Sequence, residues 1–211
     1  MNFTTIIVTR SKSCHIKTLH AILRINIRCL KNNINNQIVY VNDDPFDKVE
    51  VIQKFLKEDT RIIFIDFGVG IDDETILQMF EKHENVGCLV FPCVREGVDW
   101  TLFKTQIKNN SSEKASQMGL HFDTDVGANV SKDIYKVKRT TPRAWFMNTK
   151  NVYKTIRDKK TGACKLNPSG MFDKLIEQGV RIYAFSAAKL SINYPHECIS
   201  NILNSAGVKV N

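Results

Sequence analysis

The sequence has no long hydrophobic run and no paired-cysteine motif. Its 211 residues contain no apolar stretch long enough to cross a bilayer, and the short run at residues 3–8 lacks the basic flank and the length of a signal peptide. The six cysteines show no Cys-x-x-Cys spacing. We therefore expect reduced packing cysteines rather than disulfides or a zinc site, no membrane span, and a cytoplasmic location.

Acidic residues are fewer than basic residues. Thirty Lys and Arg stand against 22 Asp and Glu, which gives a net charge of +8. Such an excess suits a nucleic acid, an anionic surface or a phosphorylated small molecule. The basic residues are scattered and no nucleic-acid-binding motif is apparent, so we expect no nucleic-acid partner. A hydrophobic content of 43% with 25% charged residues is typical of one globular domain with a substantial core.

Strand-like runs alternate with helical patterns in the first hundred residues. Strands are expected at residues 5–8, 37–41, 62–65 and 87–91. The helical segments between them carry apolar stripes of the kind that face a core. Those stripes are Ile16, Leu19, Leu23, Ile27 and Leu30; Val49, Ile52, Phe55 and Leu56; and Ile76, Met79 and Phe80. Alternation of this kind predicts an α/β fold with a doubly wound, mostly parallel or mixed central sheet flanked by helices.

The second half of the chain is less regular. Residues 109–138 are polar with few periodic apolar positions, which predicts a long functional loop or a partly mobile segment. After it we expect strands at residues 144–148 and 180–185, and helices at residues 171–178 and 196–203.

Polar side chains follow the first two predicted strands. Thr9 and Arg10 come directly after the first, where a hydroxyl and a guanidinium could meet an anion or a ring. Asp43 and Asp44 follow the second. Because Asp44 precedes Pro45, it is expected to cap a helix. Asp43 has no such role, so it is the better candidate for contact with a base or a ribose.

Asp66 ends the third strand and is the best metal candidate. A divalent ion on a nucleotide diphosphate usually takes only one or two protein carboxylates, since phosphate and water supply its other ligands. Asp72 and Asp73 are expected mainly as acids at a helix N-terminus. Asp66-Phe67-Gly68 also spells the magnesium motif of protein kinases. The other kinase motifs are absent upstream, so that interpretation is discarded.

These three strand ends together resemble the nucleotide-sugar-binding half of the GT-A glycosyltransferases. Residues 90–100, VFPCVREGVDW, and 142–152, PRAWFMNTKNV, resemble the strands that flank the acceptor site in that family. Over its whole length the chain resembles glycosyltransferase domains of chlorella viruses that help to build capsid glycans. The resemblance implies one domain over residues 1–211, with a nucleotide-binding half at 1–100 and an acceptor half at 101–211.

The implied activity is metal-dependent transfer of a hexose from a UDP-sugar to a glycan or glycoprotein acceptor, with Mn²⁺ or Mg²⁺ as cofactor. By the same resemblance, the expected place is the host cytoplasm, and further domains could follow in a longer polypeptide. The uridine site would be lined by Thr9, Arg10 and either Asp43 or Asp44. Asp66 would be the first acid of the metal motif. Gly68 stands where the family has a second acid, so Asp66 would act almost alone or with Asp72 or His196.

The catalytic base is left open among several acids. Asp123 and Asp125 lie in the polar segment, where a lid could close, and Asp99 is a further candidate. Asp173 is favoured because its predicted helix corresponds to the base-bearing segment of the family. The alternative function is a non-catalytic nucleotide- or nucleic-acid-binding α/β module, which the +8 charge and Gly68 both support. A more distant third is a nucleotidyltransferase, which normally needs two acids where this chain has Asp66 and Gly68.

Overall fold

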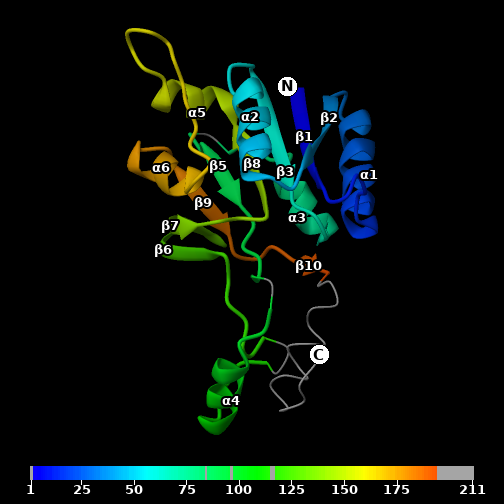
Figure 1. Ribbon diagram of the computed structural model, residues 1–211, viewed down its shortest axis with the longest axis vertical. Helices are drawn as coiled ribbons and strands as arrows, with labels where there is room; N and C mark the ends of the chain where they lie inside the picture. Colours follow the sequence, from blue (N-terminus) through cyan, green and yellow to red (C-terminus); the bar gives the residue numbers. More distant parts are fainter. Residues whose placement is uncertain (1, 84, 96, 115–116, 194–211) are drawn as a thin grey trace.

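A computed structural model describes the chain except for residues 1, 84, 96, 115–116 and 194–211. Its centre is an eight-stranded sheet in the order β2-β1-β3-β8-β5-β9-β7-β6 (Figure 1). The strands are β1 (Asn2–Thr9), β2 (Asn35–Asn42), β3 (Thr60–Ile65), β5 (Cys88–Val90), β6 (Thr124–Ser131), β7 (Ile134–Thr140), β8 (Ala144–Asn148) and β9 (Ile182–Phe185). A small second sheet pairs β4 (Val69–Ile71) with β10 (Leu190–Ile192) in antiparallel fashion.

The central sheet is mixed and mostly parallel. β1 pairs in parallel with β2 and β3, and β5 pairs in parallel with β9. β8 is antiparallel to both β3 and β5, and β7 is antiparallel to both β9 and β6. Only β7 and β8 among the described strands of this sheet therefore run against the others. The predicted α/β class and mixed sheet are confirmed.

Helices cover both faces of the sheet. α1 (Ile16–Lys31) and α3 (Asp73–Gln78) pack on one face, whereas α2 (Pro45–Phe55), α5 (Thr149–Ile156) and α6 (Met171–Glu177) pack on the other. Strand β3 shows why: all six of its residues are buried, with Ile62 and Phe64 in one core cluster and Ile63 and Ile65 in the other. Alternate residues of a strand point to opposite faces, so β3 contributes to two cores.

Helix α4 (Trp100–Lys108) lies away from this body at the far end of a projecting segment (Figure 1). Each of its residues retains some solvent exposure. No helix in the described part of the chain is long and apolar enough to cross a membrane.

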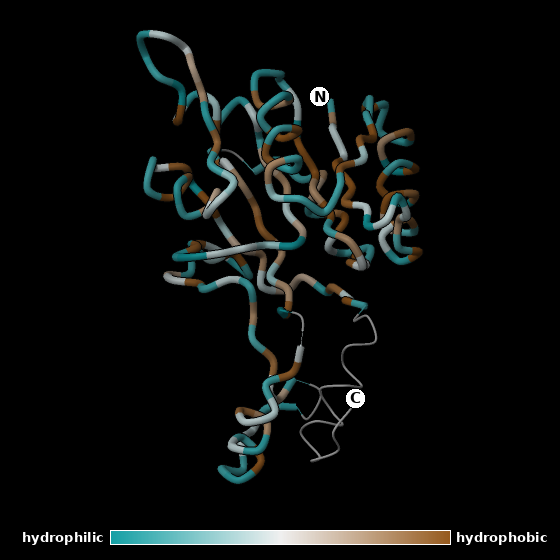
Figure 2. The backbone as a smooth tube through the Cα atoms, in the orientation of Figure 1, coloured by the Kyte–Doolittle hydropathy of each residue, from teal (hydrophilic) through white to brown (hydrophobic). Residues whose placement is uncertain are grey.

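The apolar stripe predicted on α1 does not face the core. Ile16 is 76% exposed and Leu30 is 69% exposed, and the other three members are exposed as well. The buried face consists instead of Thr18, Ala21, Ile22, Ile25 and Cys29. α1 therefore carries two apolar faces, and brown hydrophobic segments are visible along it in Figure 2. The expectation was wrong because both faces repeat with the same helical period.

A pair of conservative substitutions tests which face of α1 is buried. Ile25→Val removes one methylene from a fully buried side chain, so we expect it to lower the free energy of unfolding by about 1 kcal/mol. Ile27→Val makes the same chemical change on the 51% exposed side, where we expect less than about 0.5 kcal/mol. Urea denaturation of both variants measures the difference. Equal losses would contradict the assignment of the faces.

The polar segment at residues 109–138 is not a continuous loop. It contains β6 and most of β7, which form an antiparallel hairpin at the edge of the sheet with several register shifts. The loop prediction was wrong because β6 is an edge strand whose residues are mostly exposed, so the apolar alternation is missing. The helix expected at residues 196–203 lies outside the described residues. Five cysteines fall within the described part, and all five are free thiols.

Candidate functional site

Polar residues from neighbouring strands meet at the carboxyl edge of the sheet. Arg10 follows β1, Asp43 follows β2 and Asp66 follows β3, and these three strands are adjacent in the sheet. Arg10 Nε donates a hydrogen bond of 2.6 Å to Asp43 Oδ2. The carboxyl edge of an open α/β sheet is where such folds usually bind ligands.

Helix α2 adds a lysine to this edge. Asp44 caps the helix by accepting hydrogen bonds from the backbone N–H groups of Phe46 (2.8 Å) and Asp47 (3.0 Å), as its position before Pro45 predicted. One turn later, Lys48 Nζ donates to Asp43 Oδ1 and lies 3.7 Å from Asp66 Oδ1. Lys48 therefore links the acids that follow β2 and β3.

Arg143 approaches the same edge from the opposite direction. It precedes β8, and because β8 is antiparallel to β3, the start of β8 lies beside the end of β3. Arg143 Nε donates to Asp66 Oδ2 at 3.0 Å, and its Nη2 donates to the carbonyl of Phe67 at 2.9 Å. The two side chains are only 10% and 16% exposed, so this ion pair is largely shielded from water.

The five residues Arg10, Asp43, Lys48, Asp66 and Arg143 form a row of alternating charge that we call the edge cluster. It holds three cations and two carboxylates. Burial raises the pKa of Asp43, but hydrogen bonds and charge from Lys48 and Arg10 outweigh it, so the pKa lies below its ordinary value. With its excess cation, the edge cluster is suited to an anionic ligand.

A pocket of about 270 Å³ opens beside the edge cluster, between α2 and α6. Lys48, Asp66 and Arg143 line one side, and Gly170 and Met171 line another. Its apolar wall includes Phe64 and Trp145, whose rings stack with centroids 5.0 Å apart. A small apolar pocket with a few convergent charged groups is the usual form of a ligand site.

The fit of a divalent ion rests on one atom. Asp66 lines the pocket, and its Oδ1 is buried with no hydrogen-bond partner among the described residues; the nearest cation to that oxygen is Lys48 Nζ, at 3.7 Å. Within the same residues there is no group of three or more His, Cys, Asp or Glu side chains that could hold a metal. Asp66 fits an ion that takes its other ligands from phosphate and water. It does not by itself form a protein-built metal centre.

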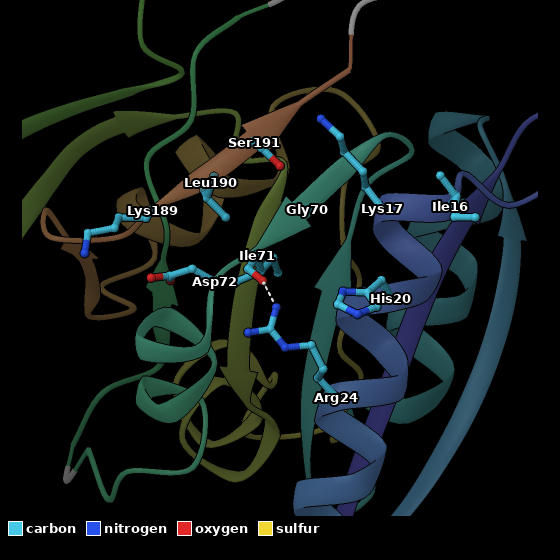
Figure 3. Close-up of a pocket in the computed structure, with 10 residues that line it drawn as sticks. All are labelled: Ile16, Lys17, His20, Arg24, Gly70, Ile71, Asp72, Lys189, Leu190 and Ser191. Atoms are coloured by element: carbon cyan, nitrogen blue, oxygen red, sulfur yellow. Dashed lines mark hydrogen bonds between the residues drawn. The ribbon is translucent and has the colours of Figure 1, made fainter.

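The remaining predicted ligand residues occupy different surroundings. Thr9 Oγ1 donates to the carbonyl of Val41 at 3.1 Å. Gly68 has a φ of +77°, a conformation that favours glycine, and its carbonyl accepts a hydrogen bond from Asn193 N. Asp72 caps α3 through Thr75 N and lines a separate cavity beside α1 (Figure 3). His196 lies outside the described residues.

The acids predicted as candidates for the catalytic base lie in separate parts of the fold. Asp123 is buried and accepts hydrogen bonds from Cys93 N (3.0 Å), Thr124 Oγ1 (2.8 Å) and Arg143 N (3.3 Å). Burial raises its pKa against these hydrogen bonds. Asp125 is exposed on β6.

Two further candidate bases begin helices. Asp173 is in the first turn of α6, which borders the pocket; its Oδ1 is buried with no hydrogen-bond partner among the described residues. Its Oδ2 lies 3.8 Å from Arg139 Nε. Asp99 caps α4 through Leu102 N. Asp173 does not itself line the pocket, although its neighbours Met171 and Phe172 do, and its role as base stays a prediction.

The pH dependence of stability tests the electrostatics of Asp43. Its folded-state pKa lies below the ordinary 3.8, so its contribution to stability is complete well above pH 3.8 and is lost as the pH falls through the folded-state pKa. We expect the urea midpoint of the wild type to fall more steeply between about pH 5 and pH 2 than that of Asp43→Asn. Parallel curves would contradict the ion pairs drawn for Asp43.

Lys48 and Arg143 were not predicted as site residues. Lys48 follows the cap residue Asp44 by one helical turn, and this spacing is a usable signal because it returns a side chain to the start of the helix. No comparable signal exists for Arg143. Its place depends on β8 running antiparallel between β3 and β5, and the sequence pattern does not reveal strand direction.

No protein-family model and no curated protein matches the chain. Among solved structures, the chain is similar to a protein of Bacillus anthracis assigned as a glucose-1-phosphate thymidylyltransferase, whose structure was determined in complex with sucrose. The two sequences are 11% identical, the match covers 99% of this chain and 96% of that chain, and the TM-score is 0.46. A second is the inositol-1-phosphate CTP transferase of T. maritima, with 10% identity, 98% and 79% coverage, and a TM-score of 0.42. Likenesses this distant identify neither a family nor an activity for the chain.

Proposed function

We propose that the protein transfers a hexose from a UDP-sugar to a glycan or glycoprotein acceptor. The observation that carries this proposal is the edge cluster, which gathers three cations at the carboxyl edge of the sheet beside a pocket. The uracil nucleobase and the hexose of the proposed donor come from the resemblance to GT-A glycosyltransferases. The same resemblance is our basis for proposing a viral capsid glycan as the acceptor and the host cytoplasm as the place.

The cations of the edge cluster would bind the diphosphate. Arg10, Lys48 and Arg143 are held at this edge by Asp43 and Asp66. Guanidinium groups bind phosphate through paired hydrogen bonds, and an ammonium acts as a point charge. The two carboxylates keep the cations in place before the donor arrives, so little reorganisation is needed when it binds.

Glycosyl transfer breaks the bond between the anomeric carbon and a diphosphate oxygen and forms a bond between that carbon and the acceptor oxygen, with UDP as the leaving group. Negative charge then develops on the leaving oxygen, and Lys48 and Arg143 would stabilise it. A Mn²⁺ or Mg²⁺ ion at Asp66 Oδ1 would supply further charge stabilisation. In an inverting reaction Asp173 would accept the proton of the acceptor hydroxyl, a role that rests on the resemblance to GT-A glycosyltransferases. Its Oδ1 has no hydrogen-bond partner among the described residues.

The test is release of UDP from a panel of UDP-hexoses, with glycan acceptors and with Mn²⁺, Mg²⁺ or a chelator. We expect release from at least one donor by the wild type, and a reduction of about 100-fold in Asp173→Asn with unchanged affinity for UDP. Asp158→Asn is the matched control, because the Asp158 side chain accepts its hydrogen bonds from Lys160 and Thr161 of its own turn. It should retain full activity.

Two outcomes would contradict the proposal in different ways. Binding of UDP without release from any UDP-hexose would favour a non-catalytic nucleotide-binding module. Formation of a nucleotide sugar and pyrophosphate from a nucleoside triphosphate and a sugar phosphate would show a nucleotidyltransferase instead.

A further inference from the structure

Helix α1 exposes a continuous row of large aliphatic side chains, which we call the α1 apolar row. Its members are Ile16, Leu19, Leu23, Ile27 and Leu30, and they are between 40% and 76% exposed. Residues 16 and 30 are separated by roughly 21 Å along a helix axis. A row of this length is unusual on a surface, because aliphatic side chains normally appear there singly.

A parallel row of basic side chains flanks the α1 apolar row. It has the same spacing, displaced by one residue, and consists of Lys17, His20, Arg24, Arg28 and Lys31. The helix contains no acidic residue. Figure 3 shows Lys17, His20 and Arg24 on the flank of α1 that faces β4 and β10. Basic and apolar rows therefore lie side by side over the full length of the helix.

Among the described residues, acidic side chains of α3 and its cap face the basic row. Asp72 lines the same cavity as Lys17, His20 and Arg24. Asp73 of α3 pairs with Arg24 (2.5 Å) and Arg28 (3.6 Å), and its neighbour Glu74 pairs with Lys189. Lys17 and Lys31, at the two ends of the row, are exposed. Counted over the described residues, and with Asp72 included, the flank keeps a net positive charge.

We propose that α1 binds an anionic lipid surface, with the α1 apolar row in the acyl boundary and the basic row against the headgroups. This arrangement is that of an interfacial amphipathic helix. Each exposed Lys or Arg close to an anionic leaflet adds to the attraction, and the net charge of +8 acts in the same direction. Figure 1 places α1 at the margin of the molecule, where a flat surface can reach it.

The composition of the row favours lipid over a protein partner. All five members are Ile or Leu, and no aromatic side chain interrupts them. Protein interfaces concentrate their binding energy in Trp, Tyr and Arg, whereas Leu is under-represented among such residues. Lipid binding requires only buried apolar area and basic charge. The inference does not depend on the proposed transferase activity.

Vesicle flotation tests the proposal on the full chain. Wild type should float with vesicles of phosphatidylcholine and phosphatidylserine, and much less with phosphatidylcholine alone. The triple variant Leu19→Ser, Leu23→Ser, Ile27→Ser should bind at least about tenfold more weakly. Lys17→Gln with Lys31→Gln should weaken binding only to the anionic vesicles. As a matched control, Ile107→Ser, Val126→Ser, Val130→Ser removes three exposed aliphatic side chains elsewhere and should bind like the wild type.

Several results would overturn the proposal. Wild type could fail to float with either vesicle, or the triple variant could float as well as wild type. A fall of several degrees in the melting temperature of the triple variant would mean that the row packs within the chain itself. A dimer in light scattering that the triple variant dissociates would assign the row to a second copy.

Discussion

Replacing Arg143 with methionine is expected to lower the free energy of unfolding by about 4 kcal/mol. The substitution keeps the apolar stem but leaves Asp66, which is only 16% exposed, without its main cation. Breaking a shielded ion pair from one side is costly because the remaining charge is poorly solvated. The hydrogen bond from Arg143 to the Phe67 carbonyl is lost as well. Urea denaturation at neutral pH measures the change.

Arg139→Met is the matched control. Arg139 is 74% exposed, and its Nε lies 3.8 Å from Asp173. An exposed pair at that distance contributes little, so we expect a loss below about 0.5 kcal/mol. A loss below about 1 kcal/mol in Arg143→Met would show that the pair with Asp66 does not hold this edge of the sheet together.

Replacing Lys48 with methionine is expected to weaken UDP binding by about 100-fold. Lys48 is the one cation of the edge cluster that contacts both carboxylates, so it lies at the centre of the proposed diphosphate site. Loss of a desolvated charge contact to a bound anion has an effect of this size. Stability should change far less, because Asp43 keeps Arg10 and Asp66 keeps Arg143. Calorimetric titration gives the affinity.

Lys54→Met tests whether the effect is specific. Lys54 lies in the last turn of the same helix, is exposed, and lies over the ring of Phe55. The Lys54→Met substitution changes the net charge by the same amount as Lys48→Met, and it should leave the affinity for UDP within about twofold of the wild type. Equal weakening in both variants would assign the effect to the overall charge of the protein rather than to the edge cluster.

The first half of the fold could be predicted because its strands and helices alternate regularly. The strand over residues 62–65 is fully buried, and the α2 stripe faces the core as expected. The face of α1 could not be predicted, since Thr18 and Ala21 occupy buried positions where the pattern shows no large apolar residue. Thr18 is buried because its hydroxyl donates to the carbonyl of Val69 at 3.1 Å, a contact between distant segments.

The second half was harder to predict because its strands are short or polar. β10 and the β6–β7 hairpin give weak apolar patterns, and helices α4 and α5 were missed. In the first half, the three-residue strand β4 was missed as well. In the site, Arg10, Asp43 and Asp66 could be placed together because parallel neighbouring strands end at one edge. Arg143 could not, since only the antiparallel insertion of β8 brings it there.

The most direct test of the edge cluster is calorimetric titration of the wild type with uridine, UMP and UDP, each with Mn²⁺ and with a chelator. If Arg10, Lys48 and Arg143 bind the diphosphate, affinity should rise at each added phosphate, and UDP should bind at least about 100-fold more tightly than uridine. The titration with the chelator shows how much of the gain in affinity the three cationic side chains supply without a metal ion. Equal binding of all three ligands, or no binding of UDP under either condition, would contradict a diphosphate site at this edge of the sheet.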